Sequence, residues 1–497
     1  MKQLRDRSWG LVIGGRTAPS ASGRTYETWD PATGELIASV PIATSEDVDH
    51  AVSSARPALK AWGRASSRHR SDILRLMAAC LLEHEHELAA IDAIDAGHPL
   101  TAMHADVRLA ADTLHQYADW GQSLTGQTLP LDVDFLTYTV REPIGIVARI
   151  VPYNHPLMFA ATRIALPLLA GNAVILKAPD QAPLSSLRLG ELFSGLLPPG
   201  ILSVLSGPGD ITGDAIVAHP DIRRIGFIGS VPTGLAIQRR AAGSTVKTVT
   251  LELGGKNPML VFPDADAEQA AHGAVEGMNF RMTAGQSCGS TSRLLVHVSL
   301  HDEVVERVRG LVESIRVDLP LTPGAEMGAL VSKQHLDRIR SLVDGAVAQG
   351  AVVVTGGGAP TDQHLADGHF YLPTVLTGVT AAMRIAQEEV FGPVLVVMPW
   401  DNEDQMFADA NSVPFGLTAS VWTTDMATAH RAIRELDTGY VWVNTAARHF
   451  AGLPFGGTKD SGVGREECLE ELLSYTNIKA VCISTPRADH NSKTPEH

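Results

Sequence analysis

The spacing of the apolar residues changes near residue 144 of this chain. Before that point, apolar positions mostly recur three and four residues apart, which predicts helices over Ser45–Trp62 and Ser71–Ala96. An earlier segment, Asp30–Gly34, has the composition of a turn between two extended segments. We therefore expect the chain to begin with strands and to continue with helices.

The second of these helices carries an apolar stripe that includes Leu76, Met77 and Cys80. Ser71 and Asp72 are placed to cap its first turn. Because Cys80 belongs to the stripe, we expect it to be a small core residue without a chemical role.

After residue 144, short apolar runs alternate with helical stretches, which is typical of βαβ units around a parallel sheet. A first series contains five expected strands: Ile144–Val151, Ala173–Lys177, Ile201–Leu205, Arg224–Ile228 and Thr248–Leu253. A second series is expected to begin after Cys288: Leu294–Val298, Ala351–Thr355, Pro393–Met398, Thr418–Trp422 and Tyr440–Val443. The two series predict two α/β domains.

The segment from Thr128 to Glu142 alternates in a way that predicts an exposed strand or hairpin. An exposed strand edge can pair with another chain. We therefore predict an oligomerisation element here, completed by a last strand near Tyr475–Ile483. The polar residues after Ile483 are expected to fray.

Length and composition limit the class of protein. A chain of 497 residues exceeds what one core usually organises, so at least two domains are expected. The 40 basic and 55 acidic residues give a net charge of −15, which disfavours nucleic acid and anionic membrane surfaces as partners. No apolar run is long enough to span a bilayer, and the N-terminus lacks the features of a signal peptide. These features predict a cytoplasmic protein.

The four cysteines are Cys80, Cys288, Cys468 and Cys482. They form no CxxC pair and no metal-ligand spacing, which favours a reducing compartment and predicts no metal site. The run His84–Glu87 is not an HExxH motif, because its histidines are two residues apart and face different sides of a helix.

Three local patterns have a possible chemical role. Gly229–Gly234 follows an expected strand, and a helix that begins there offers backbone N–H groups to a pyrophosphate, although many strand–helix junctions share this composition. Cys288 lies among small residues. This pattern indicates either an accessible nucleophile or an inert residue in a tight turn. Glu252 ends an apolar strand, either buried as a general base or facing solvent.

Seven segments in order resemble motifs of the NAD(P)-dependent aldehyde dehydrogenase superfamily. They are Pro152–Leu157, Lys177–Asp180, Phe227–Ser230, Leu251–Pro258, Gly285–Cys288, the segment around Glu389 and Phe391, and Pro454–Glu466. The resemblance covers almost the whole chain. No GxGxxG fingerprint is present, which agrees with the family's fold.

The resemblance implies an α/β fold with a Rossmann-type cofactor-binding domain, an α/β catalytic domain and a small β oligomerisation element. The implied boundaries are 1–124 and 144–253 for the cofactor-binding domain, 254–456 for the catalytic domain, 125–143 and 475–484 for the oligomerisation element, and 485–497 for the tail. A homodimer or homotetramer is expected.

The resemblance also implies the chemistry. Cys288 is the expected nucleophile, Asn154 and the Cys288 N–H hold the oxyanion, and Glu252 activates the nucleophile, the deacylating water or both. The implied cofactor-binding residues are Lys177, Asp180, Gly209, Gly229, Ser230, Glu389 and Phe391.

Departures from the family pattern bear on specificity. Asp180 replaces a glutamate, and because an acid there repels a 2′-phosphate, NAD is favoured over NADP. Tyr153 replaces a tryptophan, and Met282–Ala284 replaces the usual residues before the glycine–glutamine pair. By position, the substrate pocket is expected to contain His155, Met158, Phe159, Thr162, Met282, Ser287, His449, Phe450 and Phe455.

This mixture of groups fits a medium-sized or aromatic aldehyde. Arg448 and His449 favour an aldehyde with a polar or acidic tail, unless Arg448 is a surface residue. Two alternatives stay open: a dehydrogenase that transfers the acyl group to CoA, and a non-catalytic protein on the same fold. Glu252 argues against the first because a base suits hydrolysis, and the complete catalytic set argues against the second.

Overall fold

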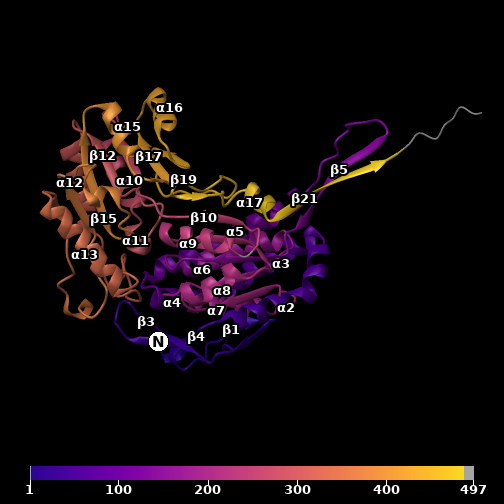
Figure 1. Ribbon diagram of the computed structural model, residues 1–497. Helices are drawn as coiled ribbons and strands as arrows, with labels where there is room; N and C mark the ends of the chain where they lie inside the picture. The colour runs from indigo at the N-terminus through magenta and orange to yellow at the C-terminus, as the bar shows by residue number, and fades with distance from the viewer. Residues whose placement is uncertain (1, 244, 486–497) are drawn as a thin grey trace, which may run out of the picture.

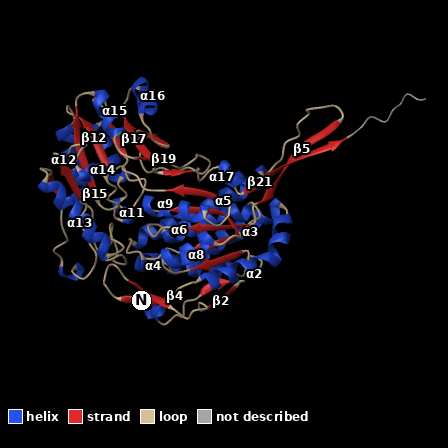
Figure 2. Ribbon diagram, viewed as in Figure 1, coloured by secondary structure: helices blue, strands red, loops and turns tan. Residues whose placement is uncertain are grey.

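Two large sheets, each covered by helices, organise the chain (Figures 1 and 2). The computed structural model describes residues 2–243 and 245–485. Within these residues no helix is both long and apolar enough to cross a bilayer. The expected polar tail lies outside the described residues.

The chain begins with short strands, as predicted. After the helical turn α1 (Lys2–Arg5), these are β1 (Leu11–Ile13), β2 (Arg16–Ala18), β3 (Thr25–Trp29) and β4 (Leu36–Pro41). The expected turn joins β3 to β4, and the Gly34 N–H donates a 2.8 Å hydrogen bond to the Asp30 carbonyl.

Four helices follow: α2 (Ser45–Arg64), α3 (Ser67–Glu83), α4 (Glu85–Asp95) and α5 (Leu100–Asp119), the last followed by the 3-10 turn η1 (Trp120–Ser123). The single helix expected over Ser71–Ala96 is wrong, because the helix breaks at His84. The break allows α4 to pack against both α5 and α7 (Leu184–Phe193).

The start of α3 also differs from the prediction. Ser66 caps the helix by accepting from the His69 N–H at 3.2 Å, whereas Ser71 lies inside the helix and donates to the Ala118 carbonyl at 2.6 Å. Met77 is fully buried and Cys80 is half-buried against the core, whereas Leu76 is 52% exposed, so the buried face follows the predicted stripe except at Leu76.

The first sheet has the strand order β2-β1-β8-β7-β6-β9-β10-β20. Its parallel centre consists of β6 (Ile146–Ile150), β7 (Ala173–Lys177), β8 (Leu202–Leu205), β9 (Ile222–Ile228) and β10 (Thr248–Glu252). These are the five strands expected for the first series. The crossovers contain α6 (Pro156–Leu169), α7, the π-helical turn η2 (Gly209–Gly213), α8 (Asp214–Ala218) and α9 (Val231–Ala242).

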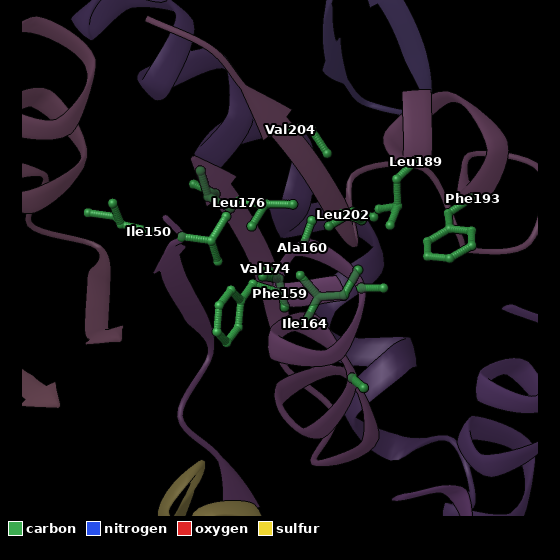
Figure 3. Close-up of a cluster of buried hydrophobic side chains, with 14 of the residues drawn as sticks. Ile150, Phe159, Ala160, Ile164, Val174, Leu176, Leu189, Phe193, Leu202 and Val204 are labelled. Atoms are coloured by element: carbon green, nitrogen blue, oxygen red, sulfur yellow. The ribbon is translucent and has the colours of Figure 1, made fainter. Parts of the chain in front are cut away.

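Apolar side chains from the central strands and from α6 and α7 pack together in the core of this sheet (Figure 3). The strands β6, β7 and β8 are buried along their whole length, as expected for a sheet that helices cover on both faces.

The second sheet has the strand order β13-β14-β15-β12-β11-β17-β18. Its strands are β11 (Pro258–Val261), β12 (Arg293–His297), β13 (Val352–Thr355), β14 (Thr374–Thr377), β15 (Val394–Trp400), β17 (Thr418–Trp422) and β18 (Tyr440–Val443). The accompanying helices are α10 (Ala267–Gly277), α11 (Phe280–Thr283), α12 (His301–Glu313), α13 (Lys333–Ala348), the 3-10 turn η3 (Gln363–Leu365), α14 (Arg384–Gln387), α15 (Glu403–Asn411) and α16 (Met426–Glu435).

The prediction that this series begins after Cys288 is wrong, because β11 precedes that residue. The sequence interpretation also omitted β14, and β13 runs antiparallel to it at the sheet edge.

The chain then returns to the first sheet. The short strands β16 (Phe415–Gly416) and β19 (Thr458–Lys459) pair with each other, and β20 (Gly462–Val463) pairs antiparallel with β10. In this register Gly462 lies opposite Glu252. The return segment therefore places the residues after Phe455 beside the end of β10.

A two-stranded ribbon projects from the body of the molecule (Figure 1). It pairs β5 (Phe135–Pro143) antiparallel with β21 (Thr476–Ser484), which follows α17 (Leu469–Ser474). Both strands expected for the oligomerisation element are therefore present and pair with each other. Large apolar side chains are exposed on the ribbon and its connecting loop: Leu131, Val133, Phe135, Leu136, Ile478 and Ile483.

Candidate active site

The carboxyl ends of the parallel strands in the first sheet place most of the candidate residues along one edge. Ligands of open α/β sheets bind at this edge. The residues and their strands are Asn154 after β6, Lys177 at the end of β7, Gly209 after β8, Gly229 and Ser230 after β9, and Glu252 at the end of β10.

A short linker, Gly254–Asn257, carries the chain from β10 to the amino end of β11. Cys288 lies at the same end of the second sheet, shortly before β12. Both glycines of the linker are needed for close packing. A Cβ at Gly254 would lie 2.0 Å from the Glu389 carboxylate, and a Cβ at Gly255 would lie 2.8 Å from the Cys288 carbonyl.

Asn257 fixes the loop that carries Cys288. Its side-chain amide donates to the carbonyl oxygens of Cys288 at 2.7 Å and Ser290 at 2.9 Å. Its side-chain oxygen accepts from the Thr418 N–H at 3.1 Å. One buried amide therefore connects the loop to the first residue of β17. The sequence interpretation did not predict this role.

The thiol of Cys288 is half-buried beside an apolar cluster formed by Leu417, Tyr440, Trp442 and Phe455. Burial raises the pKa of the Cys288 thiol to about 12, and the charges of Glu389 and Glu252 add to the increase. Because the thiolate is the reactive form, this cysteine needs a base to become a nucleophile.

Glu252 is a candidate for that base. Its side chain is 5% exposed, and neither carboxylate oxygen has a hydrogen-bond partner in the described part of the chain. Burial, followed by the charge of Glu466, raises the pKa of Glu252 well above its usual range. The interpretation of Glu252 as a solvent-facing residue is therefore wrong.

A buried ionic cluster lies close to Glu252. Glu466 forms ion pairs with Arg149 at 2.5 Å and with Arg163 at 2.9 Å. Burial alone would raise the pKa of Glu466, but the two arginines outweigh it and lower the pKa. The environment thus favours the carboxylate form of Glu466 and shifts its neighbour Glu252 toward the protonated form. The sequence contained one indication of the cluster, which is an arginine inside the apolar strand β6.

Asn154 follows β6 and is 3% exposed. Its side-chain oxygen has no hydrogen-bond partner among the described residues. The next residue, His155, forms an ion pair with Asp106 on α5, with 2.7 Å between Nδ1 and Oδ2. Sequence patterns did not predict Asp106.

Three predicted cofactor-binding residues contact one another. Lys177 Nζ forms an ion pair with the Asp180 carboxylate, which also accepts a 3.0 Å hydrogen bond from the Gly209 N–H. Ser230 is the N-cap residue of α9, and its hydroxyl lies 3.0 Å from that of Thr233. The first backbone N–H groups of α9 therefore face the same edge as Asp180.

Glu389 and Phe391 belong to a turn that α13 fixes from behind. The Gly255 N–H donates to Glu389 at 3.0 Å, and burial raises the pKa of Glu389 to about 7. Phe391 has a φ of 55°, an uncommon value for a residue with a side chain. His335 Nε2 lies 2.6 Å from the Phe391 carbonyl, and Arg338 donates to the carbonyls of Glu389 and Val390 at 2.7 and 3.0 Å.

Among the predicted pocket residues, Phe455 belongs to the apolar cluster beside Cys288, and His449 packs against Phe455. His449 lies 4.8 Å from Phe455 and 6.0 Å from Tyr440 between ring centroids, and it forms an ion pair with Glu467. Phe159 lies 5.8 Å from His155. Tyr440, Trp442 and Leu417 complete the cluster beside Cys288 and were not predicted as pocket residues.

The other predicted pocket residues have more ordinary surroundings. Met158 and Met282 pack against the core of the first sheet, and Ser287 accepts a 3.3 Å hydrogen bond from Asn279. Thr162 is buried and donates to the Met158 carbonyl, whereas Phe450 is 62% exposed. Arg448 is 64% exposed and lies 3.7 Å from Glu276, consistent with a surface residue.

Comparisons with known proteins agree with this architecture. The model of the aldehyde dehydrogenase family matches residues 18–481. The chain is 45% identical over 487 residues to aldehyde dehydrogenase tropH of Talaromyces stipitatus, covering 97% of this chain and 94% of that protein.

Solved structures agree equally well. The NAD+ complex of an aldehyde dehydrogenase from Bacillus cereus is 36% identical with a TM-score of 0.93, covering 98% of both chains. Betaine aldehyde dehydrogenase from Staphylococcus aureus, in complex with NAD+, is 33% identical with a TM-score of 0.93, covering 99% of this chain and 98% of that one. The chain belongs to the aldehyde dehydrogenase family. It has the fold of that family, and it is an oxidoreductase of the aldehyde dehydrogenase class.

Proposed function

We propose that this protein oxidises an aldehyde to a carboxylic acid with NAD+, through a thiohemiacetal and a thioester on Cys288. The observation that carries the proposal is the state of Glu252. It is a buried carboxyl group with no fixed partner among the described residues, and its charge acts on the Cys288 thiol. A carboxyl group held in this way is suited to accept and return a proton.

The proposed first half-reaction begins when Glu252, in its ionised form, removes the proton of Cys288. The sulfur attacks the aldehyde carbon, and the oxygen that becomes negative is held by the Asn154 side-chain amide and the Cys288 N–H. A bound nicotinamide supplies the hydride acceptor. Loss of hydride from the tetrahedral carbon restores a carbonyl and leaves a thioester on Cys288.

The second half-reaction is hydrolysis. Glu252 first releases to solvent the proton that it took from Cys288, which is the proton in the overall balance. Glu252 then takes a proton from water, the resulting hydroxide attacks the thioester carbon, and the carbon–sulfur bond breaks. The carboxylic acid leaves and the sulfur regains its proton. Overall, one aldehyde, one NAD+ and one water give one acid, one NADH and one proton. Division into two steps replaces one difficult reaction with two easier ones.

We propose that a dinucleotide binds at this edge of the first sheet. In this proposal the Lys177–Asp180 pair binds ribose hydroxyls, and the first turn of α9, with Gly229 and Ser230, binds the pyrophosphate. Glu389 would bind the nicotinamide ribose, with Phe391 beside it. The NAD+ complexes among the related structures support this assignment. We propose NAD rather than NADP because the Asp180 carboxylate repels a 2′-phosphate.

We also propose the division of the chain that the sequence implied. Residues 1–124 and 144–253 form the cofactor-binding domain, and residues 254–456 form the catalytic domain. The change from the first sheet to the second between β10 and β11 supports this boundary. The ribbon of residues 125–143 and 475–484 is proposed to bind a second copy of the chain, because an isolated ribbon with exposed apolar residues is marginally stable.

The test is NADH formation from a panel of aldehydes, with NAD+ and NADP+ in parallel and with and without CoA. We expect NAD-dependent oxidation without CoA, and loss of turnover in a folded Cys288→Ala variant. A matched control is Cys80→Ala, which changes a half-buried cysteine far from the site in the sequence. Product that forms only with CoA would identify the acyl-transfer alternative, and no turnover of any aldehyde would favour the non-catalytic alternative.

A further inference from the structure

We propose that His155, held by Asp106, is a specificity-determining residue that donates a hydrogen bond to an oxygen atom of the substrate. The substrate class is then a planar, aromatic or conjugated aldehyde that carries an acceptor oxygen, either a hydroxyl or a carboxylate. This inference rests on the proposed function and names the group that the binding site selects.

The geometry of the pair leaves one nitrogen available. Asp106 on α5 is buried, and its Oδ2 lies 2.7 Å from His155 Nδ1. The His155 side chain keeps 15% of its surface accessible, and its Nε2 has no hydrogen-bond partner among the described residues. Because Asp106 occupies Nδ1, the protonated ring has a second N–H, at Nε2, for which no described residue is a hydrogen-bond partner.

The charges around His155 favour this protonated form. Burial alone would lower the pKa of His155, but the charge and hydrogen bond of Asp106 and the charge of Asp92 on α4 raise it above its usual value. His98, in the turn between α4 and α5, has its pKa lowered to about 3 by burial and is neutral. Among the described residues of α4, α5 and their connecting turn, the titratable groups that interact electrostatically with His155 are thus Asp92, Asp106 and His98.

Aromatic and ionic contacts connect His155 to the wall that contains Cys288. Its ring lies 5.8 Å from Phe159, and the Arg163 guanidinium lies 5.2 Å from the Phe159 ring. Arg163 donates to Glu467 at 2.9 Å, and Glu467 lies 3.3 Å from His449.

The contacts then reach the cysteine itself. His449 packs on Phe455 and Tyr440, and these rings form the cluster against which Cys288 packs. His155 also directly follows Asn154 at the carboxyl end of β6. A continuous series of contacts therefore connects the His155–Asp106 pair to the aromatic cluster beside Cys288, and we infer that the substrate binds between them. A flat substrate fits between aromatic rings.

The remaining N–H of His155 explains the choice of an acceptor oxygen. A partly buried cationic donor that loses access to water needs a replacement partner, and a substrate without an acceptor leaves it unpaired. Sites built to hydrogen-bond a substrate group strongly reject analogues that lack that group. An unsubstituted aromatic aldehyde should therefore be a poor substrate.

The experiment compares benzaldehyde with its 3- and 4-hydroxy and 3- and 4-carboxy derivatives, with NAD+ as cofactor. We expect the wild-type protein to prefer at least one derivative over benzaldehyde, and the hydroxy and carboxy arms identify which acceptor is bound. His155→Phe should reduce this preference in kcat/KM roughly 10- to 100-fold, mainly through KM. Asp106→Asn should reduce it less, and His155→Gln, which keeps a donor, should retain part of it.

The chain offers a matched control. His104, also on α5, forms a similar pair with Glu85, with 2.7 Å between Nδ1 and Oε1, and no described contact connects that pair to Cys288. His104→Phe should leave the preference unchanged. A wild-type protein without preference, or an unchanged preference in His155→Phe, would overturn the inference while leaving aldehyde oxidation intact.

A second measurement separates this inference from the proposed function. In the Cys288→Ala background, calorimetry measures the binding of benzoate and of the substituted benzoate that corresponds to the preferred aldehyde. If no aldehyde turns over, the 3- and 4-hydroxy and the 3- and 4-carboxy benzoates are all measured. We expect the acceptor-bearing acid to bind more tightly, and the additional His155→Phe change to abolish the difference. Equal binding with and without His155 would contradict the role of His155, whatever the result of the turnover assay.

Discussion

The side-chain amide of Asn257 donates a 2.7 Å hydrogen bond to the carbonyl oxygen of Cys288. Asn257 is the last residue of the linker from the first sheet, whereas Cys288 precedes β12 of the second. The bond therefore connects the segment that carries the proposed base to the loop that carries the proposed nucleophile. Small displacements of a nucleophile have large effects on rate, so we expect this hydrogen bond to affect turnover by fixing the position of Cys288.

Substitution of Asn257 tests that link. Asn257→Ala leaves the buried carbonyls of Cys288 and Ser290 and the Thr418 N–H without their partner. We expect a loss of about 1–3 kcal/mol in unfolding free energy and a larger proportional loss of kcat than of cofactor affinity. Denaturant unfolding and steady-state kinetics measure the two effects. Unchanged kcat in a folded variant would contradict the proposed role of Asn257.

The pH dependence of Cys288 follows from its surroundings. The pKa of its thiol is raised to about 12, so the thiol holds its proton at neutral pH, and the pKa of Glu252 is also raised. Because deprotonation activates both, the rates of alkylation and of acylation should increase as the pH rises above neutral. Iodoacetamide labelling of Cys288 at a series of pH values measures this increase.

Glu252→Gln adds a control to the labelling experiment. The charge of Glu252 contributes to the raised pKa of Cys288, although burial is the larger cause. Removal of that charge should therefore shift the labelling profile toward lower pH while reducing turnover. A profile that moves in the opposite direction would show that Glu252 does not act on the thiol by its charge.

The buried ion pairs of Glu466 predict an effect on stability. Arg149 is 1% exposed and Glu466 is 4% exposed at the side chain, and their contact is 2.5 Å. Arg149→Met leaves the Glu466 carboxylate with one cation instead of two, so we expect a loss of about 3–5 kcal/mol. Arg309→Met is the matched control, since its exposed pairs with Glu306 and Glu313 should contribute little. Equal losses in the two variants would contradict this account.

Asp180 predicts the cofactor preference. Its carboxylate contacts Lys177 and accepts from the Gly209 N–H, and in the proposed function it binds a ribose hydroxyl. Asp180→Ser removes the negative charge and should increase kcat/KM with NADP+ relative to NAD+ by about 10-fold or more. The reason is that the 2′-phosphate of NADP+ is then no longer repelled by a carboxylate in a partly buried site. Asp210→Ser, which changes the exposed neighbour of Gly209, is the control. The same ratio in both variants would show that Asp180 does not exclude NADP+.

The exposed ribbon predicts the assembly state. Leu136 and Ile478 are 46% and 62% exposed on β5 and β21. If a second copy covers this surface, Ile478→Asp should weaken the oligomer, and size-exclusion chromatography with light scattering should detect smaller species at low concentration. Asn477→Asp, one residue earlier on the same strand, is the control. A wild-type protein that is monomeric at micromolar concentration would contradict the proposed interface.

Much of the fold follows from local patterns. The apolar runs at Ala173–Lys177, Thr418–Trp422 and Tyr440–Val443 coincide with β7, β17 and β18, since strands buried in parallel sheets are continuous apolar segments. In contrast, β11 is short and begins directly after the glycine-containing linker, so its pattern does not stand out. The helix break at His84 depends on how α4 packs against α5 and α7, which local sequence does not encode.

In the site, too, local features can be predicted from the sequence and distant partners cannot. Composition around Cys288 and Glu252 indicates a nucleophile and a base, and the family resemblance selects between the alternatives. Residues that contact each other but lie far apart in the sequence cannot be paired in this way. Arg149 and Glu466 are 317 residues apart, and Asp106 and His155 are 49 apart. Only the folded chain brings such pairs together, so no spacing rule in the sequence predicts them.

The covalent role of Cys288 is the central claim, and mass spectrometry of acid-quenched enzyme during turnover tests it most directly. With NAD+ and an aldehyde that the enzyme oxidises, the account predicts an acyl adduct on the peptide that contains Cys288. This adduct increases the mass of the peptide by the mass of the aldehyde less two hydrogen atoms. The Cys288→Ala variant should show neither adduct nor NADH. Full turnover in Cys288→Ala, or an adduct only on another residue, would contradict the account.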